Sequence, residues 1–409
     1  MSQWKPLLTG NSKKAAEIKL GEIAAILSLE VKNVDSINLM GGGGGLSLFL
    51  AYYGRYKGSN EHIDLCNDVL NKIIDLCNET DPYYPFAEGI TGMCWTMQHL
   101  NDNNFIEANV NELFTDLDEI LKDEIIYFIQ ESDFGYDFFH GALGMAFYLL
   151  KNNNKKCDEY IELFLNELKK KCNYNNALKT VKLKSKVSDR KLEVRSVYNF
   201  SLSHGMAGII NFLAKYIQKI ENKEEHLQLL TGLINYFKNH EQDPNVYKSY
   251  FPNWLDETET PNSSRLAWCY GDLGIGLSLY RAANLLNDDN LKQYSLSVLK
   301  HTTTRINPEV EQVYDAGLCH GATGNAHIYH RLFNETGIEE FRNTAIYWHE
   351  VGLRMAKYKD GLAGYKYLAG ANKLVNDTGF LNGIAGIGLS LISAISDIEP
   401  KWDECLLIS

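Results

Sequence analysis

Two short segments of the sequence, fifty residues apart, place cysteines and a histidine beside paired glycines. Cys269 stands two residues before a Gly-x-x-Gly motif, and Cys319 has the same place before the next motif, with His320 between the thiol and the glycine. Thiolates and an imidazole favour zinc over magnesium or calcium. Three protein ligands are the number expected when the metal keeps one position open for chemistry. The sequence therefore predicts a zinc site; the alternative is two buried cysteines and a histidine that caps a helix.

Further side chains near such motifs could take part in a reaction. His204 directly precedes another glycine motif, and its ordinary pKa of about 6.5 suits a general acid or base; the alternative is a ring bonded to backbone. Asp137 lies just before the neighbouring motif, where the alternative is an ordinary helix N-cap. Arg265, four residues before Cys269, could stabilise developing negative charge or could be a solvated surface residue. His140 has the same place as His204 but no evident task.

The glycine motif is an internal repeat that occurs seven times, each time followed by a mostly apolar segment. Glycine at a helix start permits unusual backbone angles, and a second glycine one turn later costs about 1 kcal/mol relative to alanine. Seven such costs need a packing reason, and tight contact between adjacent helices would supply one. The first glycines of the motifs are Gly42, Gly89, Gly141, Gly205, Gly271, Gly321 and Gly383.

Amphipathic runs alternate with these apolar segments, with apolar residues at three- and four-residue intervals. A helical hairpin made of one run and one apolar segment cannot bury its apolar face alone, so it must stack on its neighbours. Neither end of the chain has a polar capping hairpin, which favours closure. We therefore predict an all-α fold, an α/α toroid of seven hairpins in one domain over residues 1–409, with seven inner and seven outer helices. The runs cover residues 14–29, 61–77, 109–129, 156–172, 224–240, 291–306 and 339–357.

Two segments depart from the repeat. Residues 173–200 contain two stretches of alternating polar and apolar residues around a turn at 187–190, which predicts a small β-hairpin insert; a basic loop is the alternative. Residues 243–265 form a long connection with three prolines and no helical period, which could provide a wall of the site.

Composition restricts the partners and the location. The net charge of −12 argues against nucleic acid as the main partner, since phosphate binders normally carry a basic patch. No apolar run reaches the roughly 20 residues of a membrane span, and the N-terminal residues lack the apolar core of a signal peptide. We therefore expect a cytoplasmic protein without a membrane span.

The chain resembles the lanthionine synthetase C-like proteins, the lantibiotic cyclases. The resemblance covers essentially the whole chain through its seven glycine motifs. Its most specific parts are residues 268–271, 318–321, 203–205 and 136–137. It implies an α/α toroid with one zinc ion. Residue by residue, it implies that the zinc ligands are Cys269, Cys319 and His320. It implies that the acid/base groups are His204 and Asp137, and that Arg265 and Tyr270 lie beside the metal.

The activity implied by the resemblance is thioether ring formation. A peptide cysteine adds to a dehydroalanine or dehydrobutyrine of a precursor peptide that a dehydratase has modified beforehand. The chain could assemble with that dehydratase and an exporter, and so lie peripherally at the membrane. One alternative adds a free thiol such as glutathione to dehydrated residues; another is a non-catalytic peptide-binding module with structural zinc. A toroidal glycosidase, using Glu88 and Asp137 as paired carboxylates, ranks lowest.

Overall fold

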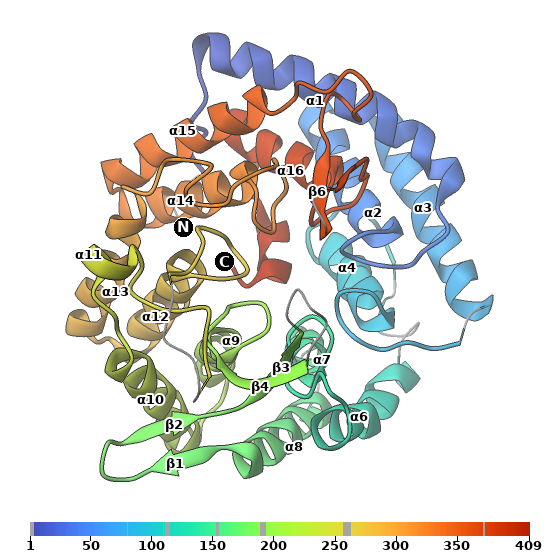
Figure 1. The fold of residues 1–409 in the computed structure, drawn as a ribbon. Helices are drawn as coiled ribbons and strands as arrows, with labels where there is room; N and C mark the ends of the chain where they lie inside the picture. The colour runs from blue at the N-terminus through green and yellow to red at the C-terminus, as the bar shows by residue number, and fades with distance from the viewer. Residues whose placement is uncertain are drawn as a thin grey trace. The chain divides into compact units, whose positions relative to one another are not determined.

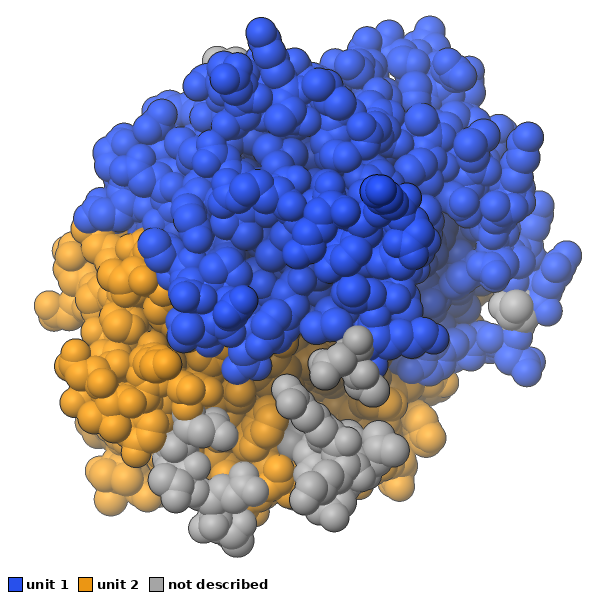
Figure 2. Space-filling view, turned by 45° about the horizontal axis from the view of Figure 1, so that its top comes forward, with its two compact units in different colours: residues 1–114, 306–409 blue, residues 115–305 orange. Residues whose placement is uncertain are grey.

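The computed structural model describes residues 4–79, 81–108, 110, 115–152, 155–188, 194–256, 263–370 and 373–409. Helices make up most of the described chain, and the strands are few and short. Internal contacts divide the chain into two compact units, coloured separately in Figure 2: residues 1–114 with 306–409, and residues 115–305. The prediction of one domain over the whole chain stays a prediction. Over the part of the chain that is described, no helix is long and apolar enough to cross a membrane.

The first unit contains helical pairs from both ends of the chain (Figure 1). Helices α2 and α3 pack as one pair and α14 and α15 as another, while α1 packs against α16 and α2. A short antiparallel pair of strands, β6 and β7, precedes α16. The elements are α1 (Gly10–Glu30), η1 (Val31–Asn33), α2 (Gly43–Lys57), α3 (Asn60–Glu79), α4 (Ile90–Asp102), α14 (Ala322–Thr336), α15 (Glu339–Arg354), β6 (Tyr367–Ala369), β7 (Lys373–Val375), α16 (Ile384–Ile395) and η3 (Lys401–Leu406).

The second unit repeats the pairing. Helix α7 packs on α8, α9 on α10 and α12 on α13, and α9 also packs on α12. Its helices are α6 (Thr115–Gln130), α7 (Ala142–Leu149), α8 (Lys155–Lys171), α9 (Met206–Lys219), α10 (Glu224–Asn239), the short α11 (Pro244–Tyr247), α12 (Asp272–Leu286) and α13 (Asp289–Thr302). The predicted run 109–129 begins in residues that lie partly outside the described chain, and α6 accounts for the rest.

Every predicted glycine motif marks a helix start. The first glycine of each motif directly precedes the helix, as Gly205 precedes α9 and Gly321 precedes α14. These helices are mostly or wholly buried, every residue of α7 and α16 included. Their partners are amphipathic; α3, for example, buries Cys66, Val69, Leu70 and Ile73 and exposes charged residues. The predicted pairing of an apolar with a polar-faced helix is therefore confirmed within each unit.

The glycines are required mainly because each helix is approached by its own preceding loop. A Cβ on Gly274 would lie 2.5 Å from the carbonyl oxygen of Trp268, six residues earlier, and one on Gly208 would lie 2.6 Å from that of Leu202. Gly271 has in addition a φ of +94°, which L side chains rarely adopt. Contact with a neighbouring repeat comes second: the Leu202 side chain lies 3.1 Å from the Cβ position of Gly274. The unusual backbone angle expected for a glycine at a helix start is thus found at Gly271, whereas the second glycines, expected at helix–helix contacts, are approached first by their own loops.

The predicted β insert is present, with more strands than expected. Strand β3 (Ser185–Ser188) pairs antiparallel with β4 (Val194–Asn199), in the register Ser185 opposite Val197, and β4 also pairs with β5 (Trp254–Leu255). The stretch from residue 180 does not form one strand, because β2 (Thr180–Lys182) pairs instead with β1 (Asn173–Asn175). The predicted turn lies partly outside the described residues. The long connection 243–265 contains α11 and β5, and its residues 257–262 are likewise outside.

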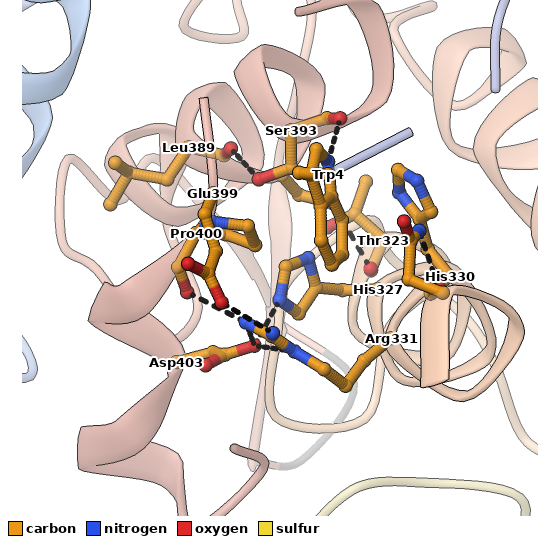
Figure 3. A network of polar contacts seen from close by, with 12 residues as sticks. Trp4, Thr323, His327, His330, Arg331, Leu389, Ser393, Glu399, Pro400 and Asp403 are labelled. Atoms are coloured by element: carbon orange, nitrogen blue, oxygen red, sulfur yellow. Dashed lines mark hydrogen bonds and ion pairs between the residues drawn. The ribbon is translucent and has the colours of Figure 1, made fainter. Parts of the chain in front are cut away.

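A buried polar network joins both chain ends to α14 in the first unit (Figure 3). Arg331 donates hydrogen bonds from Nε and Nη2 to Asp403 Oδ2, at 3.0 and 2.8 Å, and His327 Nε2 lies 2.9 Å from the same oxygen. Trp4 Nε1 donates to the Ser393 carbonyl at 2.9 Å. Burial alone would raise the pKa of Asp403, but the Arg331 charge and the His327 contact hold it well below its usual range. The network therefore contains an ionised carboxylate in the core of the unit.

Candidate active site

A histidine–carboxylate pair lies at the helix starts of the second unit. His204, just before α9, has its Nδ1 atom 2.7 Å from Oδ2 of Asp137, in the loop before α7. The other oxygen of Asp137 accepts backbone N–H groups from Phe139 at 2.7 Å and His140 at 2.9 Å. The N–H of His204 donates to the Ser201 hydroxyl at 3.0 Å. Because Asp137 accepts at Nδ1, the Nε2 atom of His204 is the nitrogen available for proton exchange.

The electrostatics of this pair favour a protonated imidazole beside a carboxylate. Burial by itself lowers the pKa of His204, but the charge and hydrogen bond of Asp137, with a smaller effect of Cys269, raise it above its ordinary value. Burial by itself raises the pKa of Asp137, yet His204 and His140 bring it below the ordinary value. The His204 side chain keeps 29% of its surface exposed and Asp137 keeps 13%. A raised pKa on a partly exposed imidazole suits a general acid, and this role of His204 stays a prediction.

Cys269 and Tyr270 lie next to this pair in the same unit. The Cys269 carbonyl accepts hydrogen bonds from the Leu202 N–H at 3.2 Å and the Ser203 hydroxyl at 3.3 Å, which ties the loop before α12 to the loop before α9. The Tyr270 ring consequently lies 6.0 Å from that of His204, centroid to centroid. The Cys269 side chain is buried, and burial raises the pKa of Tyr270. These contacts bring His204 of one glycine motif together with Cys269 and Tyr270 of the next.

Arg265 begins the loop that leads into α12. It is half-buried. Its carbonyl oxygen lies so close to Gly271 that a Cβ on this glycine would meet it. The loop thus fixes the backbone of Arg265 relative to the helix start. Its side-chain role in the reaction stays a prediction.

Asp272 anchors the long connection and was missed by the sequence analysis. The buried carboxylate accepts the N–H groups of Tyr250 at 2.8 Å and Phe251 at 3.0 Å, and Arg305 Nη1 lies 3.6 Å from it. Burial raises the pKa of Asp272 to about 6, against the opposing charge of Arg305. Its partners lie more than twenty residues away, so spacing offers no signal for them; the only sequence signal is an acidic residue inside an otherwise apolar motif.

Cys319 and His320 precede α14 in the first unit. The Cys319 N–H donates to the Leu381 carbonyl at 3.1 Å, and both side chains are half-buried. His320 Nε2 lies 3.8 Å from Oδ2 of Asp315, whose other oxygen accepts the Gly317 N–H at 2.9 Å. A carboxylate beside an imidazole can orient it as a ligand. Asp315 is a further residue that the sequence analysis missed.

The donor types fit a zinc ion. The predicted zinc ligands are Cys269 of the second unit and Cys319 and His320 of the first, and their assembly around one ion stays a prediction. Two thiols and an imidazole suit zinc rather than magnesium or calcium, which prefer oxygen ligands. Three ligands are one fewer than a closed structural zinc site requires. The set therefore fits the predicted ion by donor chemistry and by number.

The chain matches the family described as lanthionine synthetase C-like protein over residues 33–407. It belongs to this family. It is 26% identical over 349 residues to the nisin biosynthesis protein NisC of Lactococcus lactis subsp. lactis, and the alignment covers 78% of this chain and 76% of that protein. The solved structure of a nisin cyclase matches with a TM-score of 0.76 at 20% identity, over 94% of this chain and 96% of the other.

These similarities confirm two predictions. The fold class, an all-α toroid, is confirmed by the structural match with nisin cyclase. The enzyme class, a lanthionine cyclase that forms thioether rings, is confirmed by membership of the lanthionine synthetase C-like family. The roles of individual residues stay predictions.

Proposed function

We propose that this lanthionine synthetase C-like protein closes (methyl)lanthionine rings by adding peptide cysteines to dehydroalanine or dehydrobutyrine in a ribosomal precursor peptide. The observation that carries this proposal is the His204–Asp137 pair, held at 2.7 Å beside Cys269 and Tyr270. The reaction needs a sulfur nucleophile and a proton donor, and the pair provides the donor. The relative named for nisin biosynthesis supports a peptide of this class as substrate.

Cys269, Cys319 and His320 would hold one zinc ion. When bound, zinc keeps a coordinated thiol deprotonated at neutral pH, so that a peptide cysteine can act as a nucleophile. The two thiolates would leave the site electron-rich, which favours a reactive sulfur. Asp315 would orient the His320 ring, since a ligand histidine commonly has a carboxylate as its second partner.

The remaining residues act on the dehydro amino acid. The peptide sulfur forms a bond to the β-carbon, and the π electrons of the alkene move toward the α-carbon and its carbonyl oxygen, giving an enolate. The Arg265 guanidinium would stabilise this charge, with Tyr270 beside it. His204 then delivers the proton from Nε2 to the α-carbon, and Asp137 holds its ring at Nδ1. The thiol proton lost and the α-carbon proton gained balance, so ring closure leaves the mass of the peptide unchanged.

The chemistry also implies one partner enzyme. A dehydratase must act before this enzyme, because the substrate contains alkenes derived from serine and threonine. We further propose a cytoplasmic enzyme that meets its dehydrated precursor in a complex with that dehydratase and an exporter, peripheral to the membrane. Co-purification of the three proteins with the precursor would test this assembly.

The test of the proposed function is a Cys269→Ala variant. Zinc content and ring formation should both be lost while the far-ultraviolet circular dichroism stays helical. Ring formation is read by mass spectrometry as loss of thiols that can be alkylated, at constant peptide mass. Full ring formation by a metal-free variant would refute the zinc role.

The same assay separates the alternatives. With glutathione present, addition of a free thiol would raise the mass of the peptide, whereas ring closure would not. A non-catalytic binding module would retain the peptide and leave its alkylatable thiols unchanged. A His204→Ala variant should keep zinc and close rings more slowly, by a factor on the order of 10².

A further inference from the structure

His140 had no evident task in the sequence, and the structure places its ring against that of His204. The two imidazole planes are parallel within 6°, with centroids 5.9 Å apart. His140 belongs to the same loop as Asp137 and donates its backbone N–H to the oxygen of Asp137 that does not face His204. One loop thus provides both the carboxylate that holds Nδ1 of His204 and a flat ring alongside its plane.

The His204 ring has neighbours on several sides. Phe139 meets it edge-on at 6.0 Å and 86°, and Tyr270 lies at 6.0 Å and 39°. Phe139 is itself packed on Trp268, with centroids 5.3 Å apart. A hydrogen bond to Asp137 alone would leave the ring free to rotate about its Cβ–Cγ bond by small angles, because terminal sp³–sp² torsions are broad. The three neighbouring rings restrict this rotation, and the ring of His140 is the one that lies parallel to that of His204.

The contacts of His140 are those of a packing residue. Its imidazole makes ring contacts with Phe134 at 5.3 Å, Phe139 at 6.2 Å and His204, and no side-chain hydrogen bond with any residue in the described part of the chain. Its side chain also favours the ionised form of Asp137 through space. Two roles are therefore distinguishable: a flat wall that any aromatic ring could provide, and a charge that only histidine could provide.

We propose that His140 is a positioning residue that fixes the plane of the His204 ring by packing, so that Nε2 keeps its aim at the α-carbon. This inference rests on the proposed function, since it assigns His204 the proton transfer. The inference goes beyond the proposed function because it assigns the role to the shape of the His140 ring rather than to its charge. Misplacement of a catalytic group by about 1 Å can cost on the order of 10²-fold in rate, and partial loss of one wall should cost less.

The experiment compares His140→Ala with His140→Phe in the full-length, zinc-loaded protein. The alanine variant should lower kcat about tenfold, with KM within about twofold of the wild type, because orientation acts on the chemical step. The phenylalanine variant should recover most of kcat, with an unchanged pH profile. Zinc content should equal that of the wild type in both.

Nitrogen-15 spectra of the imidazoles supply a readout that does not depend on turnover. The His204 signals, assigned with a His204→Gln variant, should report Nδ1–H in the wild type and the phenylalanine variant, and averaging of states in the alanine variant. An alanine variant with wild-type kcat and spectra would overturn the proposal. So would a phenylalanine variant as slow as the alanine variant, which would assign the role to charge. Failure of the wild type itself to close rings would refute the proposed function and not this packing, which the spectra would still test.

Discussion

The two units each contain a histidine–carboxylate pair of similar geometry, with opposite proton behaviour. In the second unit, His204 and Asp137 lie 2.7 Å apart and retain solvent access; in the first, His327 and Asp403 lie 2.9 Å apart and are fully buried. The pKa of His204 is raised by its partner, whereas burial lowers the pKa of His327 despite the same kind of partner.

Burial is the largest cause of the lowered pKa of His327, and a third partner adds to it. Arg331 donates two hydrogen bonds to Asp403 and neutralises its charge, so a proton on His327 would add a second cation to a buried site. No such arginine contacts Asp137 in the described part of the chain, whose charge is available to His204. A short histidine–carboxylate distance therefore does not identify an acid/base residue. We expect solvent access and the remaining partners of the carboxylate to distinguish a pair that transfers protons from one that stabilises the fold.

The largest effect on stability should come from Asp403→Ala. Removing one partner of a buried ion pair costs about 3–5 kcal/mol, because Arg331 would remain buried and uncompensated. Urea denaturation of this variant measures the loss, with Asp137→Ala as the matched control in the partly exposed pair. An equal loss in the free energy of unfolding of both variants would contradict the distinction between a structural and a partly exposed pair.

A smaller effect, on rate rather than stability, is expected for Asp137→Asn. Without the carboxylate charge the pKa of His204 falls, so the alkaline limb of the kcat profile should move to lower pH and kcat should drop on the order of 10²-fold. The free energy of unfolding should change by less than about 1 kcal/mol, since the pair is partly exposed. Loss of stability without a shifted pH profile would make the exposed pair structural like the buried one.

Buried histidines near the Asp403 network should make the first unit sensitive to acid. Burial, and then the charge of His327, lower the pKa of His349 to about 3, and neither of its ring nitrogens has a hydrogen-bond partner in the described chain. Its contribution to stability is present above the unfolded-state pKa of about 6.5 and is lost as pH falls toward 3. His349→Leu should therefore be more stable than the wild type at pH 5 by about 2 kcal/mol, relative to their difference at pH 8. Thermal denaturation at the two pH values checks this; equal differences would contradict it.

The smallest effect is expected at the chain end. Trp4→Phe keeps most of the apolar contact and loses the hydrogen bond to the Ser393 carbonyl, at a cost of about 1 kcal/mol. Guanidinium denaturation measures it. A cost above that of Asp403→Ala would show that the tryptophan, rather than the ion pair, stabilises the network.

The sequence predicted the repeated elements well and the long-range anchors poorly. Helix starts were accessible because a paired glycine precedes each of them, and the partner helices because their apolar residues follow the helical period. The sequence did not predict that β1 and β2 form a pair of their own apart from β3. The reason is that Asn173–Asn175 is exposed and shows no alternation of polar and apolar residues. His327 and Asp403 are 76 residues apart, so nothing in the spacing links them.

The candidate site was predictable to a similar degree. Residues inside the glycine motifs, such as His204 and Cys269, could be selected by their equivalent positions. Asp272 and Asp315 act through backbone N–H groups of loops, and such partners emerge only when the chain is folded. The outcome at His140 was also beyond the sequence, because a ring-on-ring contact has no signature in residue type.

The approach of each loop carbonyl to a glycine six residues later has a consequence for how this scaffold can vary. In several loops the turn is also held by a side chain that accepts backbone N–H groups, as Asp137 and Ser201 do for His140 and His204. The residue just before the first glycine contributes its backbone N–H to these bonds and not its side chain. That one place holds glutamate, histidine, tyrosine and asparagine in different repeats: Glu88, His140, His204, Tyr270, His320 and Asn382. The side chain at this position thus varies between repeats while the loop and the helix start stay the same. New chemistry could be introduced there by single substitutions without redesigning the helices.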